Sequence, residues 1–411
     1  MHGKDIDEVS AGHSLTSSWD LARGYRYAGV HCGIRPDPAR LDLALVASDI
    51  PATAVGVFTQ NRVRAAPVRL CQQRLPRRDA RGIVVCSGNA NACTGSRGVE
   101  DAHRMTALAA RALRCQEEQL LVCSTGVIGQ HLPMPRIEEG IAAAARSLAP
   151  GPVALEKAAR AILTTDTRIK VSTRKVTFPA AEFTVTGFAK GAAMIGPNLA
   201  TMLAFVVTDA AVPPDALAQL AGQAANRSFH CVSVEGHTST NDTVLFFANG
   251  TGPPLAENAR ARLGVAITAV CTDLARAIAA DAEGASHLVT LSVEGLRDDG
   301  EARRIAKAVA DSALVKTALF GADPNWGRIV SAAGYAGVPF EEEDLSLWLG
   351  DLLLYHAGTP QPFDPATAAA YLTGNRDIEL RLRFGLGSGR CTFWTCDLGY
   401  EYIRLNAEYT T

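Results

Sequence analysis

One threonine in the middle of the chain would become a complete catalytic unit if the peptide bond before it broke. It is Thr201, which follows Ala200 in the segment KGAAMIGPNLATML, residues 190–203. Cleavage of the Ala200–Thr201 bond gives Thr201 a free α-amino group with a pKa of about 7.7–8, close to its own hydroxyl. The residue would then supply both nucleophile and base. The alternative interpretation is a loop that leads into a buried strand, because residues 202–207 form an apolar run.

A hydroxyl nucleophile of this kind also needs hydrogen-bond donors for an oxyanion and a pocket for its acyl donor. Thr125 and Gly126 end an apolar run, and they can direct a hydroxyl and a backbone N–H at a developing negative charge. A tight turn from strand to helix is the alternative interpretation of Gly126. Thr164, Lys190 and Glu283 are of ordinary types at their places when each is taken alone.

A second polar segment stands out after the apolar run. It reads EGHTSTNDT, residues 235–243, and carries four hydroxyls together with four acid, amide or imidazole side chains. This exceeds what a turn requires and indicates a structural polar network beside an active site. A solvent-facing hairpin loop is the simpler alternative.

The elements that must position these residues are strands and helices mixed along the whole chain. Strands are expected at residues 41–47 and 53–58, joined across 49–51, and at 82–86, 119–123, 183–189, 229–234, 243–247, 287–293, 345–349, 378–384 and 391–398. Helical spacing of apolar residues predicts helices near residues 105–113, 137–148, 217–224, 257–281 and 301–313. Hairpin-like strand pairs within this mixture favour an α+β layered fold over a regularly alternating parallel sheet.

The length and charge of the chain limit the number of structural units and the kinds of partner that we expect. A chain of 411 residues suggests two or three structural units, and 47% hydrophobic with 20% charged residues is typical of a globular protein. Forty basic and forty-two acidic side chains leave a net charge of −2, so no large positive field attracts nucleic acid or anionic lipid. We expect neither as a partner.

The cysteine, histidine and hydropathy patterns bear on three questions: metal binding, cellular compartment and membrane insertion. Ten cysteines are ordinary usage at this length, and several lie in apolar runs, so we expect buried thiols at Cys86, Cys123, Cys231 and Cys271. No CxxC pair occurs and the nine histidines lack metal-ligand spacing, so we expect no metal site. Residues 1–20 are polar without an apolar signal core, which favours the cytoplasm. Residues 191–208 carry no charge, but Pro197 and Asn198 interrupt them, so we expect no membrane span.

The motifs together resemble one enzyme family, that of the ornithine acetyltransferases, also called glutamate N-acetyltransferases or the ArgJ family. The likeness covers about residues 27–411 and rests on ordered motifs, among which the segment 190–203 resembles the self-processing site of that family. The others are FTQN and AAPV (58–61 and 65–68), STGVIG (124–129), TTDT (164–167), VTDA (207–210), TSTNDT (238–243), DPNWGR (323–328) and RLNAEY (404–409).

The resemblance implies a fold and a processing event. The fold is an α/β/β/α sandwich of the DmpA type, with a smaller C-terminal α/β region at about residues 285–411. Cleavage before Thr201 would leave a polar leader (1–26) and the rest of an α chain (27–200), and a β chain (201–411), assembled as an α2β2 heterotetramer. Carried over by position, Thr201 is the nucleophile and Thr125 and Gly126 are the oxyanion donors. The substrate-contacting residues are then Thr164, Lys190, Thr201, Glu283, Asn406 and Thr411.

The reaction implied is a ping-pong acetyl transfer from N2-acetyl-L-ornithine to L-glutamate in the cyclic pathway of arginine biosynthesis, without a cofactor. Some members of the family also accept acetyl-CoA, and no residue pattern here decides whether this chain does. An amidohydrolase or aminopeptidase of similar architecture, a secondary-metabolism acyltransferase, a catalytically silent amino-acid sensor and a cysteine mechanism through Cys123 are the alternatives.

Two departures from the family pattern stand out. The family often has an acidic residue at the position of His237, and more glycine at Ala192 and Ala193. Neither departure touches the nucleophile, and both bear on cleavage rate or substrate preference.

Overall fold

The computed structural model describes residues 19–178, 181–196, 202–252 and 257–408. Its first sheet joins eight described strands in the order β4-β3-β2-β8-β7-β6-β5, with β1 beside β2. These strands are β1 (Tyr25–Val30), β2 (Leu43–Phe58), β3 (Arg77–Asn89), β4 (Leu120–Val127), β5 (Lys170–Phe178), β6 (Ala181–Lys190), β7 (Leu203–Thr208) and β8 (Thr243–Ala248).

Strand β2 turns this sheet into two layers. Its first half pairs with β1 and β3, its second half pairs with β8, and the register with β3 shifts between Ala47 and Ala54. The two layers face each other, since the ring of Tyr27 on β1 packs edge-on against Phe188 on β6 at a centroid distance of 6.4 Å. The expected pair of strands at 41–47 and 53–58 is therefore wrong: residues 43–58 form one strand, because the extended backbone continues through Asp49–Pro51 and pairing with β3 resumes at Ala52 after a register shift.

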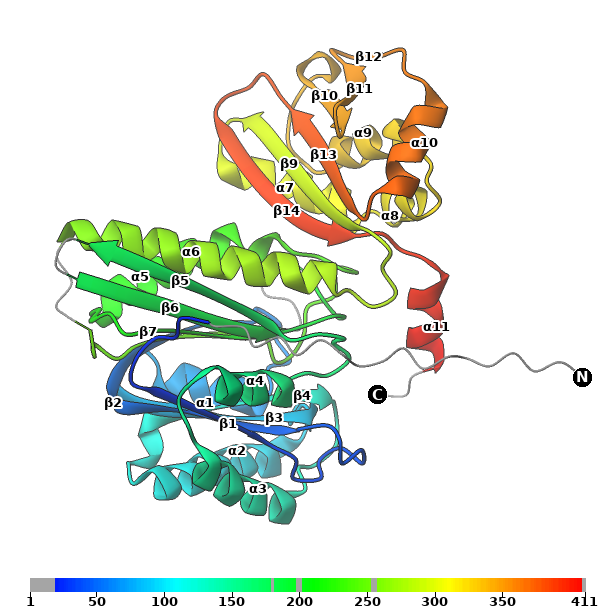
Figure 1. Ribbon diagram of the computed structural model, residues 1–411. Helices are drawn as coiled ribbons and strands as arrows, with labels where there is room; N and C mark the ends of the chain where they lie inside the picture. The colour runs from blue at the N-terminus through cyan, green and yellow to red at the C-terminus, as the bar shows by residue number, and fades with distance from the viewer. Residues whose placement is uncertain (1–18, 179–180, 197–201, 253–256, 409–411) are drawn as a thin grey trace, which may run out of the picture.

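Helices cover both outer faces, as Figure 1 shows. The layer of β1–β4 is covered by α1 (Ala66–Arg74), α2 (Gly95–Leu113), α3 (Met134–Ser147) and α4 (Pro152–Ala161), and the layer of β5–β8 by α5 (Pro214–Arg227) and α6 (Glu257–Ala280). Apolar side chains of both strand faces are buried in two core clusters, one on each side of the β5–β8 layer. The α/β/β/α sandwich is confirmed.

Helix α6 is the long amphipathic helix that the sequence predicts. Leu263, Ile267, Val270 and Leu274 of its stripe are each at most 1% exposed, and burial of such side chains is worth about 1.5–3 kcal/mol apiece. By length and composition alone, residues Ala259–Ala280 would also suffice to cross a membrane. Half of that window is buried inside the protein, as in a core helix.

A second, six-stranded sheet follows, in the order β12-β11-β10-β13-β9-β14 among the described residues. Its strands are β9 (Leu288–Leu296), β10 (Ser346–Leu349), β11 (Leu352–His356), β12 (Thr359–Pro360), β13 (Asp377–Arg383) and β14 (Gly389–Cys396), accompanied by α7 (Asp299–Asp311), α8 (Ala313–Phe320), α9 (Trp326–Gly334) and α10 (Pro365–Gly374). The sheet contacts α6 through β9 and β14. The last helix, α11 (Tyr400–Glu408), returns to the sandwich.

The expected strand at residues 229–234 is wrong. Phe229–Cys231 form a 3-10 turn, and Val232 makes only an isolated bridge to Trp394 of β14. Phe229 and residues 231–234 are buried, so the apolar character of this segment comes from burial and not from strand pairing, and short apolar runs do not distinguish the two.

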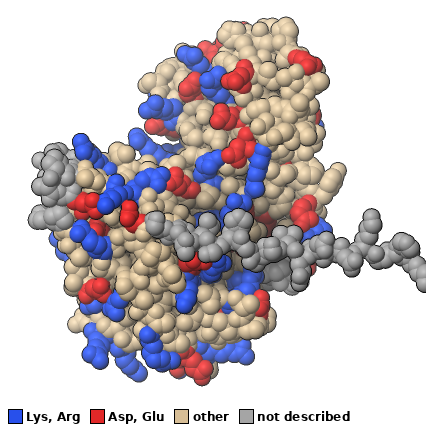
Figure 2. Space-filling view, viewed as in Figure 1, with Lys and Arg blue, Asp and Glu red and all other residues tan. Residues whose placement is uncertain are grey.

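Charges and thiols are distributed as the composition suggests. Figure 2 shows lysine, arginine and carboxylate side chains of both signs interspersed over the visible face. All ten cysteines are free thiols, and the expected burial of Cys86, Cys123, Cys231 and Cys271 is confirmed. Among the residues that the structure describes, no group of three His, Cys, Asp or Glu side chains lies close enough to hold a metal ion.

Candidate active site

The start of strand β7 is held from two sides at Met202. The Met202 N–H donates to Oδ1 of Asp242 at 3.1 Å, and the Met202 carbonyl accepts from the Thr243 N–H at 3.2 Å. The next residue, Leu203, pairs with Lys190 on β6. Ala200 and Thr201, the expected cleavage site and nucleophile, lie outside the described residues, so Met202 is the described residue next to the proposed scissile bond.

Lys190 ends strand β6 with its side chain buried, at 1% exposure. Its Nζ donates to the Thr164 hydroxyl at 3.2 Å. Burial lowers the pKa of Lys190 to about 8, against the opposing fields of Asp166 and Asp242. A buried ammonium of this kind is a strong partner for the carboxylate of a bound amino acid, because little water competes for it.

Asp166 fixes the surroundings of Lys190. Its carboxylate accepts from Lys170 Nζ at 2.6 Å, from the Gly191 N–H at 2.6 Å and from the Thr164 N–H at 3.0 Å. Burial alone would raise the pKa of Asp166, but Lys170, Lys190 and the Gly191 N–H outweigh it and lower the pKa to about 2. Lys170 also binds Asp281 at 2.6 Å, so this ionic cluster ties the loop before β5 to the end of α6.

Thr125 and Gly126 lie at the end of β4, beside β3. Thr125 is 2% exposed, and Gly126 adopts φ +130° with its Cα so near β3 that an added Cβ would lie 2.3 Å from the Gly88 carbonyl carbon. Only glycine fits this position, because side chains disfavour such a φ and the backbone of Gly88 leaves no room. The interpretation of Gly126 as a tight structural position is thus compatible with an oxyanion role for its N–H.

The polar segment 235–243 lies against this strand end. Asn241 donates through Nδ2 to the Ser124 carbonyl at 2.8 Å and to the Ala90 carbonyl at 2.6 Å. Ser239, Asn241 and Asp242 are all buried, whereas His237 is exposed. The solvent-facing hairpin loop is therefore wrong for residues 239–242, and the polar network is confirmed.

Glu283 and Asn406 meet at the other end of the site. The Glu283 N–H donates to the Ala192 carbonyl at 2.9 Å, and Asn406 donates through Nδ2 to Oε2 of Glu283 at 3.3 Å. Helix α11 approaches this loop closely, since a Cβ on Gly284 would lie 2.4 Å from the Tyr402 nitrogen. Thr411, the remaining expected contact, lies outside the described residues.

Glu235, the first residue of the polar segment 235–243, is a carboxyl near Glu283 to which the sequence assigns no role of its own. The Ile195 N–H donates to its Oε1, and Oε2 accepts no hydrogen bond from any described residue. Burial raises the pKa of Glu235 to about 7, with a smaller contribution in the same direction from Glu283.

The contacts form one connected set. From the backbone of Ser124 next to Thr125, the set runs through Asn241 to its neighbour Asp242 and on to Met202. A second branch runs from Thr164 through Lys190 and its neighbours to Ala192, Glu283 and Asn406. The residues at the ends of both branches are among the site residues expected from the sequence. The buried aspartates between them, Asp166 and Asp242, are not, although they lie inside the TTDT and TSTNDT motifs.

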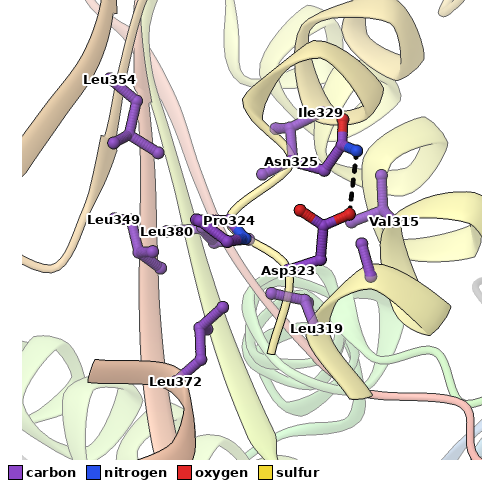
Figure 3. Close-up of a pocket in the computed structure, with 11 residues that line it drawn as sticks. Val315, Leu319, Asp323, Pro324, Asn325, Ile329, Leu349, Leu354, Leu372 and Leu380 are labelled. Carbon is purple, nitrogen blue, oxygen red and sulfur yellow. Dashed lines mark hydrogen bonds between the residues drawn. The ribbon is translucent and has the colours of Figure 1, made fainter. Parts of the chain in front are cut away.

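The motif DPNWGR lies elsewhere. Asp323, Pro324 and Asn325 line a small cavity in the C-terminal region, otherwise lined mostly by leucines and other aliphatic side chains (Figure 3). Asn325 donates to Asp323 at 3.0 Å and caps helix α9 by accepting from the Arg328 N–H. No candidate site residue lines this cavity, so the motif has a structural part in the fold.

Comparisons with known proteins show the family to which the chain belongs. The family model described as "ArgJ family" matches residues 26–411. The chain is similar to an arginine biosynthesis bifunctional protein ArgJ from Thermosynechococcus vestitus, at 43% identity over 98% of this chain and 100% of the relative, and to ArgJ 1 from Nostoc sp., at 45% identity over 97% and 98%. Among solved structures, that of an arginine biosynthesis bifunctional protein argJ from Bacillus halodurans is 37% identical, covering 50% of this chain and 98% of its own, with a TM-score of 0.48. The chain belongs to the ArgJ family.

Proposed function

We propose that the protein transfers the acetyl group of N2-acetyl-L-ornithine to L-glutamate through an acetyl ester on Thr201. The observation that carries the proposal is the pair of opposite charges joined by the backbone of residues 190–192: buried Lys190 at one end and Glu283 with Asn406 at the other. Membership in a family whose relatives are named for arginine biosynthesis supports the choice of substrates.

The charges match the substrates. An α-amino acid presents a carboxylate, for which the Lys190 ammonium is the partner, and Thr164 keeps that ammonium oriented. Ornithine also carries a side-chain ammonium, for which the carboxylate of Glu283 is the partner, while Asn406 holds one of its oxygens. Glutamate carries no such ammonium, so Glu283 would discriminate between the two substrates.

The reaction proceeds in two half-reactions. The Thr201 hydroxyl attacks the acetyl carbonyl while the Thr201 amine takes its proton, and the Thr125 hydroxyl and Gly126 N–H stabilise the oxyanion. Ornithine leaves with that proton on its amine, and the acetyl ester remains. The amine of glutamate then attacks the ester, and N-acetylglutamate leaves while the proton returns to the hydroxyl.

The proposal includes the maturation and setting of the enzyme. The chain cleaves itself between Ala200 and Thr201, and its α and β chains assemble as α2β2. The reaction needs no cofactor, and acetyl-CoA is a second acetyl donor to be tested with glutamate alone. Ten free thiols support a reducing compartment, the cytoplasm.

The test compares the wild-type chain with Thr201→Ala. We expect the wild type to yield two fragments, the second beginning Thr-Met-Leu-Ala, and to form N-acetylglutamate from acetylornithine and glutamate. Thr201→Ala should stay one chain of 43.4 kDa and form no product. Free acetate in place of N-acetylglutamate would identify a hydrolase, and an intact, active Thr201→Ala chain would overturn the mechanism.

A further inference from the structure

Two free thiols face each other where the C-terminal sheet contacts the sandwich. Cys231 ends the 3-10 turn that follows α5, Cys391 lies on β14, and their sulfur atoms are 3.7 Å apart although 160 residues separate them in the chain. Cys231 is buried, whereas Cys391 is only half-buried. A disulfide holds its sulfur atoms about 2 Å apart, so a small rotation of the two side chains would bring them into bonding distance.

The backbone beside the two thiols is fixed. Val232, the residue after Cys231, forms an isolated parallel bridge with Trp394 of β14, and the Ser233 N–H donates to the Trp394 carbonyl at 3.0 Å. On its other side, β14 pairs with β9 along its whole length, so the backbone of Cys391 is also held. Groups that a rigid scaffold keeps in contact react with each other much faster than with the same groups in solution.

Asn226, near the end of α5, brings a cation to the thiols. Its carbonyl accepts from Cys231 Sγ at 3.3 Å, and its Oδ1 accepts from Arg303 Nη1 on α7 at 3.4 Å. The Nε of Arg303 is buried and donates to no acceptor among the residues that the structure describes. Buried donors are nearly always paired, so a negative charge on Cys231 would give this guanidinium a partner.

The surroundings favour a thiolate on Cys231 over one on Cys391. A hydrogen bond from Cys391 lowers the pKa of the Cys231 thiol against the effect of burial, and the positive field of Arg303 lowers it further. The same contact raises the pKa of Cys391, as do burial and the nearby Asp299 of α7. Burial lowers the pKa of His230 to about 4, so Arg303 and not His230 supplies positive charge here.

We propose that Cys231 and Cys391 form a reversible disulfide when the protein meets a peroxide, and that this bond fastens the C-terminal sheet to the sandwich. The Cys231 thiolate attacks one peroxide oxygen, the O–O bond breaks, and Cys231 becomes a sulfenic acid while hydroxide leaves. The Cys391 sulfur then attacks the Cys231 sulfur, the S–O bond breaks, and the oxygen leaves as water with the proton of Cys391. The two thiols lose two electrons, and the peroxide ends as two waters once the hydroxide takes up the proton that Cys231 released. In a reducing compartment such a bond is transient, because cellular thiols reduce it again.

The place of this bond in the fold determines what it would restrain. Strand β14 continues into Asp397, whose Oδ1 accepts from the N–H groups of residues 286–287 at 2.9 and 3.0 Å, and then into α11, which carries Asn406. A disulfide at Cys391 would hold this strand at its opposite end. Both cysteines follow Thr201 in the sequence, so the bond would lie within one chain before and after cleavage.

The first experiment treats the folded, full-length protein with hydrogen peroxide, blocks the remaining thiols with iodoacetamide under denaturing conditions, and maps the peptides by mass. We expect a peptide pair joined through Cys231 and Cys391 in the wild type, which dithiothreitol separates again. Cys231→Ser and Cys391→Ser should give no such pair. Cys93→Ser is the matched control, because it removes an exposed thiol outside the pair and should leave the disulfide as in the wild type.

Two further measurements test the effect of the bond and the part of the cation. The oxidised wild type should melt about 3 °C or more above the reduced protein, because a bond across so long a stretch of chain restricts the unfolded state. The same treatment should not raise the melting temperature of Cys391→Ser. Arg303→Gln should slow disulfide formation about 3-fold or more by lowering the thiolate fraction of Cys231, whereas Arg303→Lys should retain more of the rate.

The outcomes are distinct. A reversible disulfide between Cys231 and Cys391, with a rise in melting temperature that neither serine variant shows, supports the proposal. A wild type in which peroxide leaves both thiols reduced, or oxidises them separately, overturns it, and a disulfide without any rise in melting temperature overturns the fastening effect. An unchanged rate in Arg303→Gln overturns the part of Arg303. The wild-type measurements need no variant, and none of them depends on the formation of N-acetylglutamate.

Discussion

Asn406 donates a hydrogen bond to Oε2 of Glu283 at 3.3 Å although 123 residues separate them in the chain. The contact exists because α11 leaves the C-terminal region and packs on the loop at Gly284, where only a residue without Cβ admits the Tyr402 backbone. The C-terminal helix thereby reaches Glu283, the residue that we propose as the partner of the side-chain ammonium of ornithine.

Substitution Glu283→Gln should therefore affect the two substrates unequally. We expect KM for N2-acetylornithine to rise about 10-fold or more, because a charge-assisted hydrogen bond of about 1.5–3 kcal/mol is lost, while KM for glutamate changes little. Steady-state kinetics in both substrates measure this. Arg404→Ala on α11 is the control, since among the described residues the ion pairs of Arg404 are with the exposed Glu401 and Glu408 of its own helix. Equal rises in both KM values would contradict the assignment of Glu283.

The oxyanion pair can be tested at Thr125 without disturbing the backbone. Thr125→Val removes the hydroxyl but keeps the shape of a buried, β-branched side chain, and we expect kcat to fall about 10²–10³-fold with little change in KM. Thr106→Val removes an equally buried hydroxyl, in α2, and should lower the melting temperature without lowering kcat. A Thr125→Val enzyme with wild-type kcat would remove the hydroxyl from the mechanism. Gly126→Ala is unsuitable, because the added Cβ meets the Gly88 backbone.

The sequence predicts most helices and strands of the sandwich because the spacing of apolar residues within each element is visible in a short stretch of sequence. The stripe on α6 and the apolar runs of β6, β7 and β8 follow from periodicity, and these elements are found where expected. The continuity of β2 is not predicted, since Asp49 to Pro51 look like a turn and only the partner strand β3 shows that pairing resumes at Ala52 beyond them. Residues 229–234 show the converse, where apolar character comes from burial alone.

The sequence predicts which residues belong to the candidate site, but it does not predict the contacts that they make. Lys190, Glu283 and Thr164 come from motif resemblance, which places residues in order without saying what they contact. The parts of Asp166 and Asp242 in the site follow from their burial and from partners distant in the chain: Gly191 is 25 residues from Asp166, and Met202 is 40 residues from Asp242. Such long-range contacts leave no periodic trace in a sequence.

The raised pKa of Glu235 predicts a pH-dependent stability. Between about pH 4.5 and 7 the folded protein keeps a proton on Glu235 that the unfolded chain has lost, so this contribution to the free energy of unfolding is present below that window and is lost as the pH rises through it. Its size is at most about 3 kcal/mol. Glu235→Gln cannot lose a proton, and its amide oxygen still accepts from the Ile195 N–H. We expect equal melting temperatures for the variant and the wild type near pH 4.5, and a higher one for the variant at pH 8. Glu118→Gln, at an exposed position, controls for the loss of one carboxylate and should run parallel to the wild type. A Glu235→Gln curve parallel to the wild type across the whole range would show that burial does not hold the proton on Glu235.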